Sequence, residues 1–574
     1  YPTSDHQTHS RNAHTSVVGG RLLVLDGLGP DAHLRKLTPQ TGGPATFWRP
    51  DVSYDGQRVL FCMRSGSGAR DTFNLYEMGI DGGGLRQITN GDYDDYDPIY
   101  APDGGIIFTT TRCNQFLPCG GSTYRMFVLA RCDADGKNIY FLSSNHESDY
   151  HPTFLPDGRI LYTRWEYYDK SVSRVHCLWT CKPDGTASSA YWGNQSKWPD
   201  ILWNARPIPH SEKVLFASGG HHNAFSGSLG IVNVREGANY PDGLYTLTPE
   251  VPWVEIGRGP KDRAYNPEFP PPSCYQGYLT PFPVGRNLFL VSARRGYTID
   301  IRTEPDVRFH SLYLMDYDGN MELLYTGRFN ILHAQPIRPR PRPPVLPSRV
   351  QWPGRMTRPE HRPADGIFYS ADVYEGTGIA RGKVRSLRVM DADSRTFGAP
   401  QQGLVYGWQL SQPYSKAGAM PVFDIVTEVP VSFLYADSTK RVLGTVPVEP
   451  DGSVNFRAPP LRTLYFQLLD ENGLCLQTMR SAVHVMPGEV RGCVGCHETR
   501  PATPTVREMV PLAMLRPPSK IEPPPWGDES VSFPRFVQPV LDRHCISCHN
   551  SDKTEGGFDL THRTEDPLDF SWPY

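Results

Sequence analysis

A short pattern repeats along the first half of the chain, and this repeat constrains the fold more than any other feature. An Asp-Gly turn precedes a short β-rich run at Asp55-Gly56, Asp103-Gly104 and Asp157-Gly158, with the glycines 48 and 54 residues apart. Between these turns, residues 75–84 (LYEMGIDGGG) and 128–137 (VLARCDADGK) each predict a strand, a tight turn and another strand. Periods of roughly 40–50 residues with four short strands are typical of β-propeller blades.

The number of blades follows from counting these units. Weaker copies of the pattern occur at residues 213–220 (KVLFASGG) and 287–296 (NLFLVSARRG). Five units are clear and a sixth is inferred, and residues 21–25 (RLLVL) are placed to complete the last blade and close the ring. We therefore predict a mainly β chain with a β-propeller over residues 1–335, of six blades with seven as the alternative.

The rest of the chain divides into three further regions. Residues 336–363 are rich in proline and arginine and predict an extended linker, either solvated or lining a surface that meets a haem or a partner. Residues 364–525 contain alternating apolar runs and an Asp-Gly turn, which predict a β-sandwich-like middle domain. Residues 526–574 predict a small helical cytochrome c module, entered by a short helix over residues 533–545.

The overall composition excludes some classes of protein. A formal net charge of −3 argues against a general nucleic-acid binder, which would show a strong basic excess. A hydrophobic content of 39% is enough for sizeable cores, so the chain is not a disordered one. The sequence has no apolar run of about 18 residues, and we expect no transmembrane helix.

Two Cys-x-x-Cys-His motifs carry the clearest chemistry in the sequence. This spacing presents two thiols to the vinyl groups of one haem and places the imidazole beneath the iron. A thioredoxin-like dithiol or half of a zinc site would need no trailing histidine, so we favour haem at both motifs. We predict two covalently bound c-type haems, with the attachment residues and iron ligands Cys493, Cys496, His497, Cys545, Cys548 and His549.

Haem attachment has consequences for the compartment and for the other ligands. Covalent attachment implies export, to the periplasm or the cell exterior, where Cys113 and Cys119 could either form a disulfide or remain buried thiols. Only His562 follows the second motif as a histidine, so its sixth ligand comes from elsewhere or the chain is truncated at Tyr574. The sixth-ligand candidates near the first motif are His484, Met479, Met486, Met509 and Met514.

The propeller sequence adds weaker candidates. His151 and His221-His222 could bind a metal or a substrate at the channel mouth, although structural roles are favoured. The acidic run 92–97 could bind calcium, but a solvated blade loop is the better interpretation. Four arginines follow equivalent strands and could either gather on one rim or form salt bridges within blades: Arg64, Arg112, Arg164 and Arg294.

Three segments of the second half resemble the hydrazine synthase alpha-subunit family. They are residues 370–389 (SADVYEGTGIARGKVRSLRV), 443–459 (LGTVPVEPDGSVNFRAP) and 476–498 (LQTMRSAVHVMPGEVRGCVGCHE). Residues 536–561 resemble a planctomycete-type cytochrome c module. The resemblance implies a six-bladed propeller, a haem-bearing middle domain and a C-terminal haem domain. It also implies redox chemistry of nitrogen compounds at the first haem and electron relay through the second.

One difference from the family is visible at the first motif. The hydrazine-forming subunit has an iron-binding tyrosine a few residues beyond it, whereas residues 498–502 here read ETRPA. The resemblance therefore concerns architecture, with His497 as the candidate proximal ligand. We expect an exported dihaem oxidoreductase for a small molecule, with a redox partner protein and other subunits as partners. The alternatives are a pure electron-transfer protein with two six-coordinate haems, or an assembly subunit with structural haems.

Overall fold

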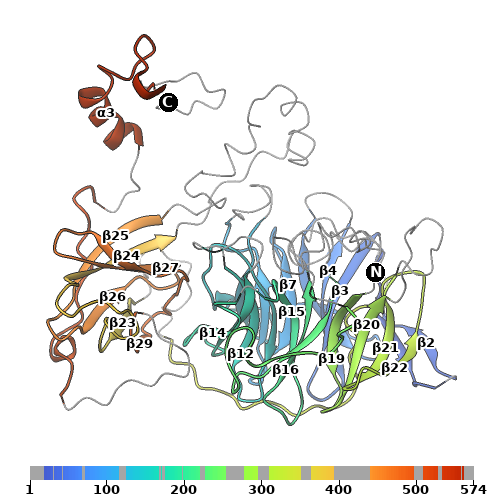
Figure 1. Ribbon diagram of the computed structural model, residues 1–574. Helices are drawn as coiled ribbons and strands as arrows, with labels where there is room; N and C mark the ends of the chain where they lie inside the picture. The colour runs from blue at the N-terminus through green and yellow to red at the C-terminus, as the bar shows by residue number, and fades with distance from the viewer. Residues whose placement is uncertain are drawn as a thin grey trace.

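The computed structural model shows a mainly β chain, as predicted, in which a propeller stands beside a smaller sandwich (Figure 1). The residues that the structure describes are 19–29, 31–39, 41, 43–66, 71–115, 125–166, 170, 175–196, 198–219, 226–251, 253, 277–294, 309–350, 364–392, 440–496, 509–527, 533–557 and 559–561. Cys119, His221-His222, His497 and His562 lie outside these ranges, so the predictions made for them concern residues that the structure does not describe.

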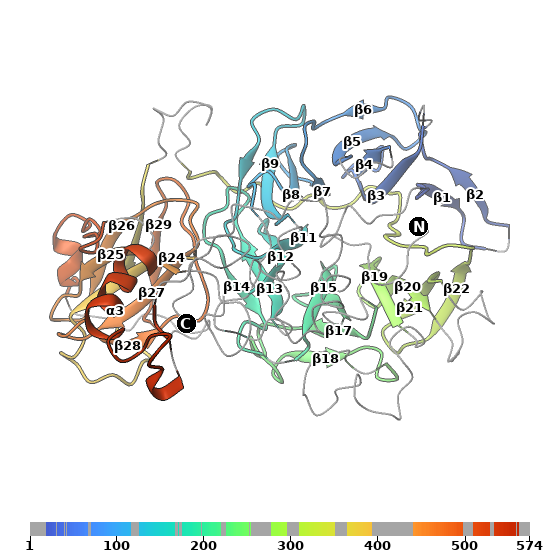
Figure 2. The ribbon, with the colours of Figure 1, turned by 90° about the horizontal axis from the view of Figure 1, so that it is seen from above.

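Five four-stranded units form the blades of the propeller (Figure 2). The first is β3 (Ala45–Val52), β4 (Arg58–Ser65), β5 (Phe73–Gly79) and β6 (Arg86–Gln87). The second is β7 (Asp95–Tyr100), β8 (Ile106–Thr110), β9 (Val128–Cys132) and β10 (Tyr140–Phe141). The third is β11 (Asp149–Phe154), β12 (Ile160–Trp165), β13 (His176–Cys181) and β14 (Ser189–Trp192). The fourth is β15 (Ile201–Pro207), β16 (Val214–Gly219), β17 (Leu229–Val232) and β18 (Leu244–Thr246), and the fifth is β19 (Gly277–Pro283), β20 (Leu288–Arg294), β21 (Ser311–Asp316) and β22 (Met321–Tyr325).

A hairpin near the N-terminus lies beside the first blade. Its strands are β1 (Leu23–Asp26) and β2 (His33–Lys36), and among the described strands they pair only with each other. Leu22, Val24 and Leu37 pack into the same core as Phe47 and Phe61 of the first blade. The predicted closing segment is therefore a strand, and the count of six blades stays a prediction beyond the five four-stranded units. The third and fourth of these units are joined into one eight-stranded sheet by a parallel contact between β13 and β15.

The Asp-Gly turns lie where the sequence predicted them. They connect β3 to β4, β7 to β8 and β11 to β12, and Gly56, Gly104 and Gly158 have φ angles of 75°, 93° and 87°. Glycine is favoured at such angles because it lacks the Cβ that makes them unfavourable for other residues. At Gly56 a Cβ would also lie 2.9 Å from the backbone of Arg338. Both the conformation of the turn and the close approach of the linker therefore require glycine here.

The described part of the linker, residues 336–350, lies along the propeller. The Arg340 amide donates to the Tyr54 carbonyl at 2.9 Å, and its guanidinium pairs with Asp51 at 2.9 Å. The Arg349 amide donates to the Asp184 carboxylate at 2.8 Å. This segment is thus bound to the protein surface rather than being a free spacer.

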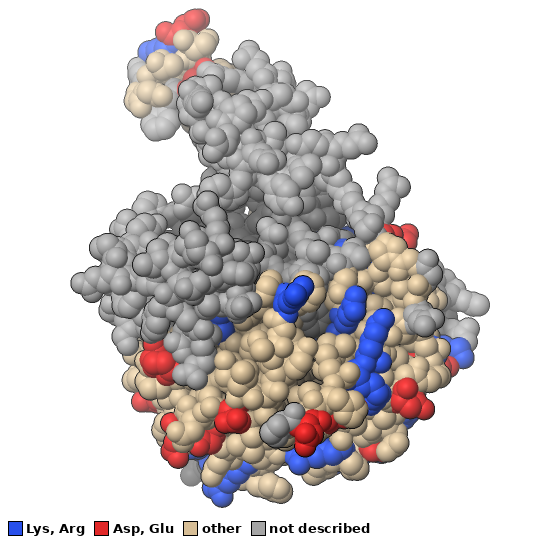
Figure 3. Space-filling model, turned by 90° about the vertical axis from the view of Figure 1, so that its right-hand side faces the viewer, with Lys and Arg blue, Asp and Glu red and all other residues tan. Residues whose placement is uncertain are grey.

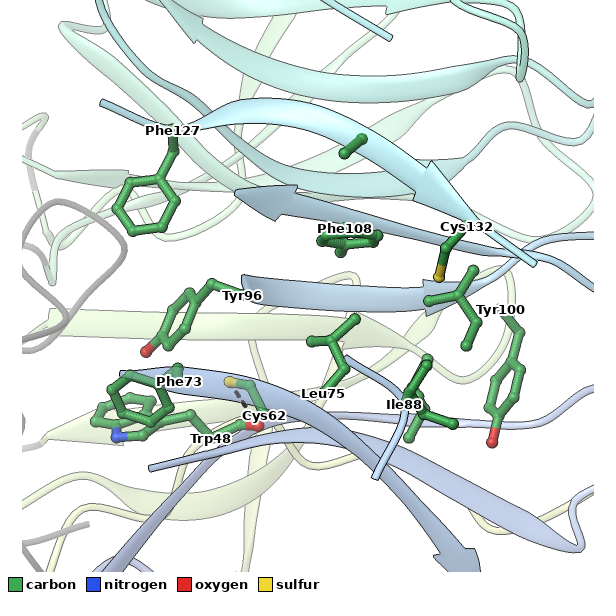
Figure 4. Packing of buried hydrophobic residues seen from close by; sticks show 13 residues of the cluster. Trp48, Cys62, Phe73, Leu75, Ile88, Tyr96, Tyr100, Phe108, Phe127 and Cys132 are labelled. Carbon is green, nitrogen blue, oxygen red and sulfur yellow. Dashed lines mark hydrogen bonds between the residues drawn. The ribbon is translucent and has the colours of Figure 1, made fainter. Parts of the chain in front are cut away.

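Aromatic residues fill the space between neighbouring blades. Figure 4 shows Phe73 and Tyr96 facing each other from the first and second sheets, with ring centroids 5.2 Å apart. The Cys62 thiol donates to the Trp48 carbonyl at 3.3 Å in the same cluster. These side chains hold adjacent sheets at a fixed angle, because close-packed interiors leave little room for adjustment.

Acidic and basic residues pair inside the blades. Arg112 lies 2.6 Å from Asp95, and Arg164 contacts both carboxylate oxygens of Asp149 at 2.9 and 3.0 Å. Salt bridges within blades were one of the two interpretations of these arginines, and the structure confirms it for Arg112 and Arg164. The acidic run does not form a solvated loop, since Asp94, Asp95 and Asp97 are buried. That interpretation was wrong because these carboxylates bind backbone amides and guanidinium groups of the blades.

The middle domain is a sandwich of two sheets, as predicted. One contains β23 (Gly366–Ser370), β26 (Val454–Ala458) and β29 (Val490–Cys493). The other contains β24 (Ser386–Ala392), β25 (Lys440–Pro447), β27 (Leu464–Leu469) and β28 (Cys475–Thr478). The rings of Phe368, Phe456 and Phe466 meet between the sheets, with centroids 5.2 to 5.8 Å apart.

The C-terminal part of the chain contributes short helices. A 3₁₀ turn spans Leu512–Leu515, a π-helical turn spans Phe533–Val537 and continues into α3 (Gln538–His544), and a second 3₁₀ turn spans Glu555–Gly557. No helix within the described ranges is long and apolar enough to cross a membrane. On the face shown in Figure 3, basic and acidic side chains both occur over the described surface, in keeping with the small net charge.

Replacement of Arg164 by methionine tests the buried ion pairs. Asp149 would stay buried without its guanidinium partner, so we expect R164M to lower the free energy of unfolding by about 3–5 kcal/mol. The exposed pair between Arg235 and Glu212 provides the control, and R235M should change stability by no more than about 1 kcal/mol. Denaturant unfolding of both variants decides the matter, and equal effects would contradict this account.

Candidate functional site

A cavity of about 1320 Å³ lies between the propeller and the middle domain. In both ribbon views, β14 of the propeller is the strand nearest the sandwich (Figures 1 and 2). The propeller contributes residues around β14, and the middle domain contributes β23, β26, β27, β28 and β29. This volume is above the range of roughly 300–1,000 Å³ that is common for small-molecule sites, so the cavity has room for a large planar cofactor.

The walls of the cavity differ in chemistry. The sandwich presents apolar side chains, including Phe368, Phe456 and Phe466. The propeller presents mainly polar groups from residues 187–189 and 194–196. Three basic side chains line the same space: Lys170, Arg480 and Arg491. An apolar wall with cations at its rim suits a cofactor that combines an apolar plane with carboxylates.

Both cysteines of the first motif line this cavity. Cys493 is the last residue of β29, where it lies opposite Ser370 of β23 in a parallel pair. Cys496 follows after a tight passage at Gly495, where a Cβ would lie 2.5 Å from the carbonyl oxygen of Glu375. Glycine is therefore required between the two thiols, and the backbone there has little freedom to move.

Strand β29 is attached to the propeller just before the motif. The Glu489 carboxylate accepts from the Ala187 amide at 2.8 Å, and the Arg491 guanidinium donates to the Ser188 carbonyl. Arg491 also donates to the His484 carbonyl at 2.8 Å. Alternate residues of a strand point to the same face. Cys493 therefore lies on the same face of β29 as Arg491, in line with Glu489 just before the strand.

A polar cluster lies in the cavity wall where the propeller meets the middle domain. Lys170 donates to the Glu166 carboxylate at 3.1 Å and to the Ser481 hydroxyl at 2.9 Å, and Asn194 donates to the same two groups. The Cys177 thiol donates to Glu166 at 3.1 Å. Burial, then the Glu166 charge, raises the pKa of Cys177 well above its usual range, so this thiol stays protonated. The sequence analysis missed this cluster because its members gave no local motif.

The structure separates the candidates for the sixth ligand of the first haem. Met479 lines the cavity, whereas His484 and Met486 are buried outside it. Met486 packs against Gly185 of the propeller, where a Cβ would lie 2.7 Å from the methionine methyl group. Met509 and Met514 do not line the cavity. Met479 is thus the only one of these five candidates at the cavity wall.

The second motif follows α3 directly, as predicted. Cys545 is the residue after the helix, and the amides of Cys548 and His549 both donate to its carbonyl at 3.0 Å. One turn of chain therefore presents the two cysteines and His549 together. All three side chains are partly accessible.

The comparisons with known proteins identify the middle region. Residues 382–498 match the family described as the hydrazine synthase alpha subunit middle domain, and this range includes Cys493 and Cys496. The chain therefore carries a middle domain of the hydrazine synthase alpha-subunit type, and this part of the resemblance is confirmed. The cytochrome c module over residues 526–574 stays a prediction. No curated protein matches the chain as a whole.

One solved structure shows the same architecture over a longer range. Kuenenia stuttgartiensis hydrazine synthase aligns with a TM-score of 0.70 and 17% identity, over 95% of this chain and 79% of that chain. At this identity the likeness concerns the fold. A putative TolB from Agrobacterium tumefaciens aligns with a TM-score of 0.33 and 16% identity, over 51% of this chain and 84% of that chain.

Acidification tests the junction at His484. Burial, followed by the charges of Arg164 and Arg491, holds the pKa of His484 well below its usual value. The folded state keeps the ring neutral, while the unfolded chain takes up a proton below about pH 6.5. The stability contributed by His484 is therefore present above that pH and is lost as the pH falls, by up to about 1.4 kcal/mol per pH unit.

We expect H484Q to flatten the decline in melting temperature between pH 7 and pH 5. The exposed His33 supplies the control, because H33Q removes a ring that stays in contact with water. A pH series of melting curves for the three proteins gives the comparison. An unchanged slope in H484Q would show that other groups govern the acid response.

Proposed function

We propose that the chain is an exported dihaem c-type cytochrome that acts as an oxidoreductase on a small molecule. The observation that carries this proposal is the opening of both thiols of the first motif, Cys493 and Cys496, into the cavity between the two domains. A motif that served only as a surface electron carrier would not need a cavity closed by a second domain.

The residues around the cavity fit a haem. Cys493 and Cys496 would form the thioether bonds, and His497 would follow them as the iron ligand. The apolar rings of the sandwich would face the macrocycle, and Lys170, Arg480 and Arg491 would meet its propionates. When bound, the haem supplies one-electron chemistry and an iron site for a small ligand.

Residues of the chain would also shield the cavity from water and hold protons beside it. The phenylalanine wall and the propeller would shield part of the cavity from bulk water, which would strengthen electrostatic interactions on that side. Ser481 and Lys170 line the cavity and share a hydrogen-bond network with the buried Glu166. This network holds protons beside the cavity, where a reduction that consumes protons would need them.

The second motif suits electron exchange with a partner. Cys545, Cys548 and His549 are partly accessible at the end of α3 (Figure 1), an arrangement that permits contact with another redox protein. Covalent haem attachment would place the protein in the periplasm or outside the cell. The alpha-subunit likeness supports assembly with other subunits and a nitrogen compound as substrate. Residues 498–502 contain no tyrosine, so hydrazine synthesis itself is not part of the proposal.

Serine replacement of the first pair of cysteines tests haem attachment. The wild type should carry two haems by pyridine haemochrome assay and intact mass, and the double variant C493S/C496S should carry one. The exposed Cys475 in the same domain gives the matched control, and C475S should retain both haems. A wild-type protein without covalent haem would overturn the proposal.

The electron-transfer alternative is favoured by one observation, the position of Met479 in the cavity wall. A thioether bound to the iron would make the first haem six-coordinate and closed to other ligands. Under the enzyme proposal the reduced wild type binds carbon monoxide at one haem. Under the alternative it binds none until Met479 is removed.

The variant M479L separates the two functions by optical spectroscopy with carbon monoxide. We expect the wild type to bind about one equivalent per chain, and M479L to bind the same amount. The control M509L removes a methionine that is exposed and outside the cavity, and should match the wild type. An inert wild type with a reactive M479L would establish the electron carrier instead.

A further inference from the structure

A second, much smaller cavity lies inside the propeller, with a volume of about 30 Å³. It is independent of the proposed haem chemistry, since none of its residues lines the large cavity. A volume of this size accommodates about one or two water molecules. Any ligand here must therefore be monatomic or nearly so.

The innermost strands of the propeller supply its walls through a repeated backbone feature. Eleven described residues other than glycine adopt a positive φ between 43° and 58°, and six of them belong to the propeller centre: one from the first strand of each blade, and His333. In the five complete blades this residue falls within a register shift of the first strand pair. The six residues are Arg49, Asp97, His151, Asn204, Thr280 and His333.

Such residues are uncommon outside glycine and cost free energy. All except Thr280 line the small cavity, so the repeated bulge brings side chains from different blades to one place. The strained backbone thus recurs at the point where the blades approach each other. Each blade contributes a different side chain to the polar site that results.

Most of these side chains satisfy one another. Arg49 pairs with Asp97 at 2.9 Å and donates to Asn204 at 2.7 Å. A third guanidinium contact, 2.7 Å long, reaches Nε2 of His151. Arginine is only a donor, so Nε2 accepts this contact and the imidazole is neutral, while the Asn204 amide faces its Nδ1 at 3.4 Å. Burial, with Arg49 and Arg206, lowers the pKa of His333 well below its usual range, so that ring is neutral as well.

Arg206 is the exception in this network. It lines the cavity, donates to the Thr153 hydroxyl at 3.3 Å and lies 5.5 Å from the centre of the Phe282 ring. Among the described residues it forms no ion pair within 4.0 Å. Its nearest carboxylates are occupied, because Asp97 pairs with Arg49 and Asp51 pairs with Arg340.

The charges around the cavity therefore do not cancel. Two guanidinium groups, Arg49 and Arg206, face one carboxylate, Asp97. Including the pair between Asp51 and Arg340 leaves the same excess of one positive charge. A charge without a counter-ion in such surroundings is costly, and a small anion would remove that cost.

We propose that a monovalent anion of halide size binds in this cavity between Arg206 and Arg49. The cavity volume limits the size of the ion, and the guanidinium of Arg206, which has no ion-pair partner among the described residues, requires a negative charge. The excess of one positive charge around the cavity calls for a single negative charge. The anion would join the first and fourth blades, which carry Arg49 and Arg206, at the centre of the propeller. Divalent oxyanions are excluded because they are too large and would reverse the local charge.

Sodium bromide is the probe for this site. Crystals of the wild-type holoprotein grown with bromide should show an anomalous peak between Arg206 and Arg49. In solution, the melting temperature should rise saturably with bromide compared with sodium gluconate at matched ionic strength. R206Q should weaken this response by about tenfold or more, because it removes the charged hydrogen-bond donor. R235Q should behave as the wild type, since Arg235 is exposed and remote from the cavity.

The two measurements together decide the proposal even if R206Q does not fold, because the wild type alone supplies both readouts. A peak in the cavity together with a saturable response supports it. The absence of a peak, or a peak without any bromide-specific change in melting temperature, overturns it. Haem content is measured separately, so a failure here leaves the proposed oxidoreductase function unaffected.

Discussion

The attachment of β29 to the propeller is the interaction on which the candidate site depends. Glu489 and Arg491 bind backbone groups of residues 187–188, and Cys493 follows two residues later along the same strand. The propeller thereby fixes the strand that carries the first thiol. Without these contacts the sandwich would keep its own core, but the cavity would lose its second wall, because neither domain encloses that space alone.

Charged groups inside the propeller make this arrangement rigid. The pairs Arg112–Asp95 and Arg164–Asp149 connect neighbouring strands deep in their blades. Buried pairs of this kind add little net stability, yet they are expensive to break. They therefore favour one register of the blade over its alternatives, and Ser144 beside the Arg164 pair in turn bonds to Thr463 of the middle domain at 2.8 Å.

Local sequence signals predicted the parts of the fold that depend on local chemistry. The Asp-Gly turns, the helix before Cys545 and the sandwich strands all follow from propensity and pattern within a few residues. The large cavity could not be predicted in this way, since Ser188 and Arg491 meet across about three hundred positions of the chain. The burial of Asp94, Asp95 and Asp97 was missed for the same reason, because their partners lie on other strands.

At the centre of the propeller, equivalent positions of the blades share a backbone conformation but carry different side chains. Arg49, Asp97, His151 and Thr280 each precede a proline, and this pair of residues is visible in the sequence at equivalent points of four blades. The residues before these prolines have φ angles of 43° to 54°, outside the right-handed helical region that a following proline disfavours. The side chains at these points differ because they meet one another rather than solvent. In this propeller the repeated backbone conformation forms the ring of blades. The side chains that differ between equivalent positions form the polar cavity at its centre.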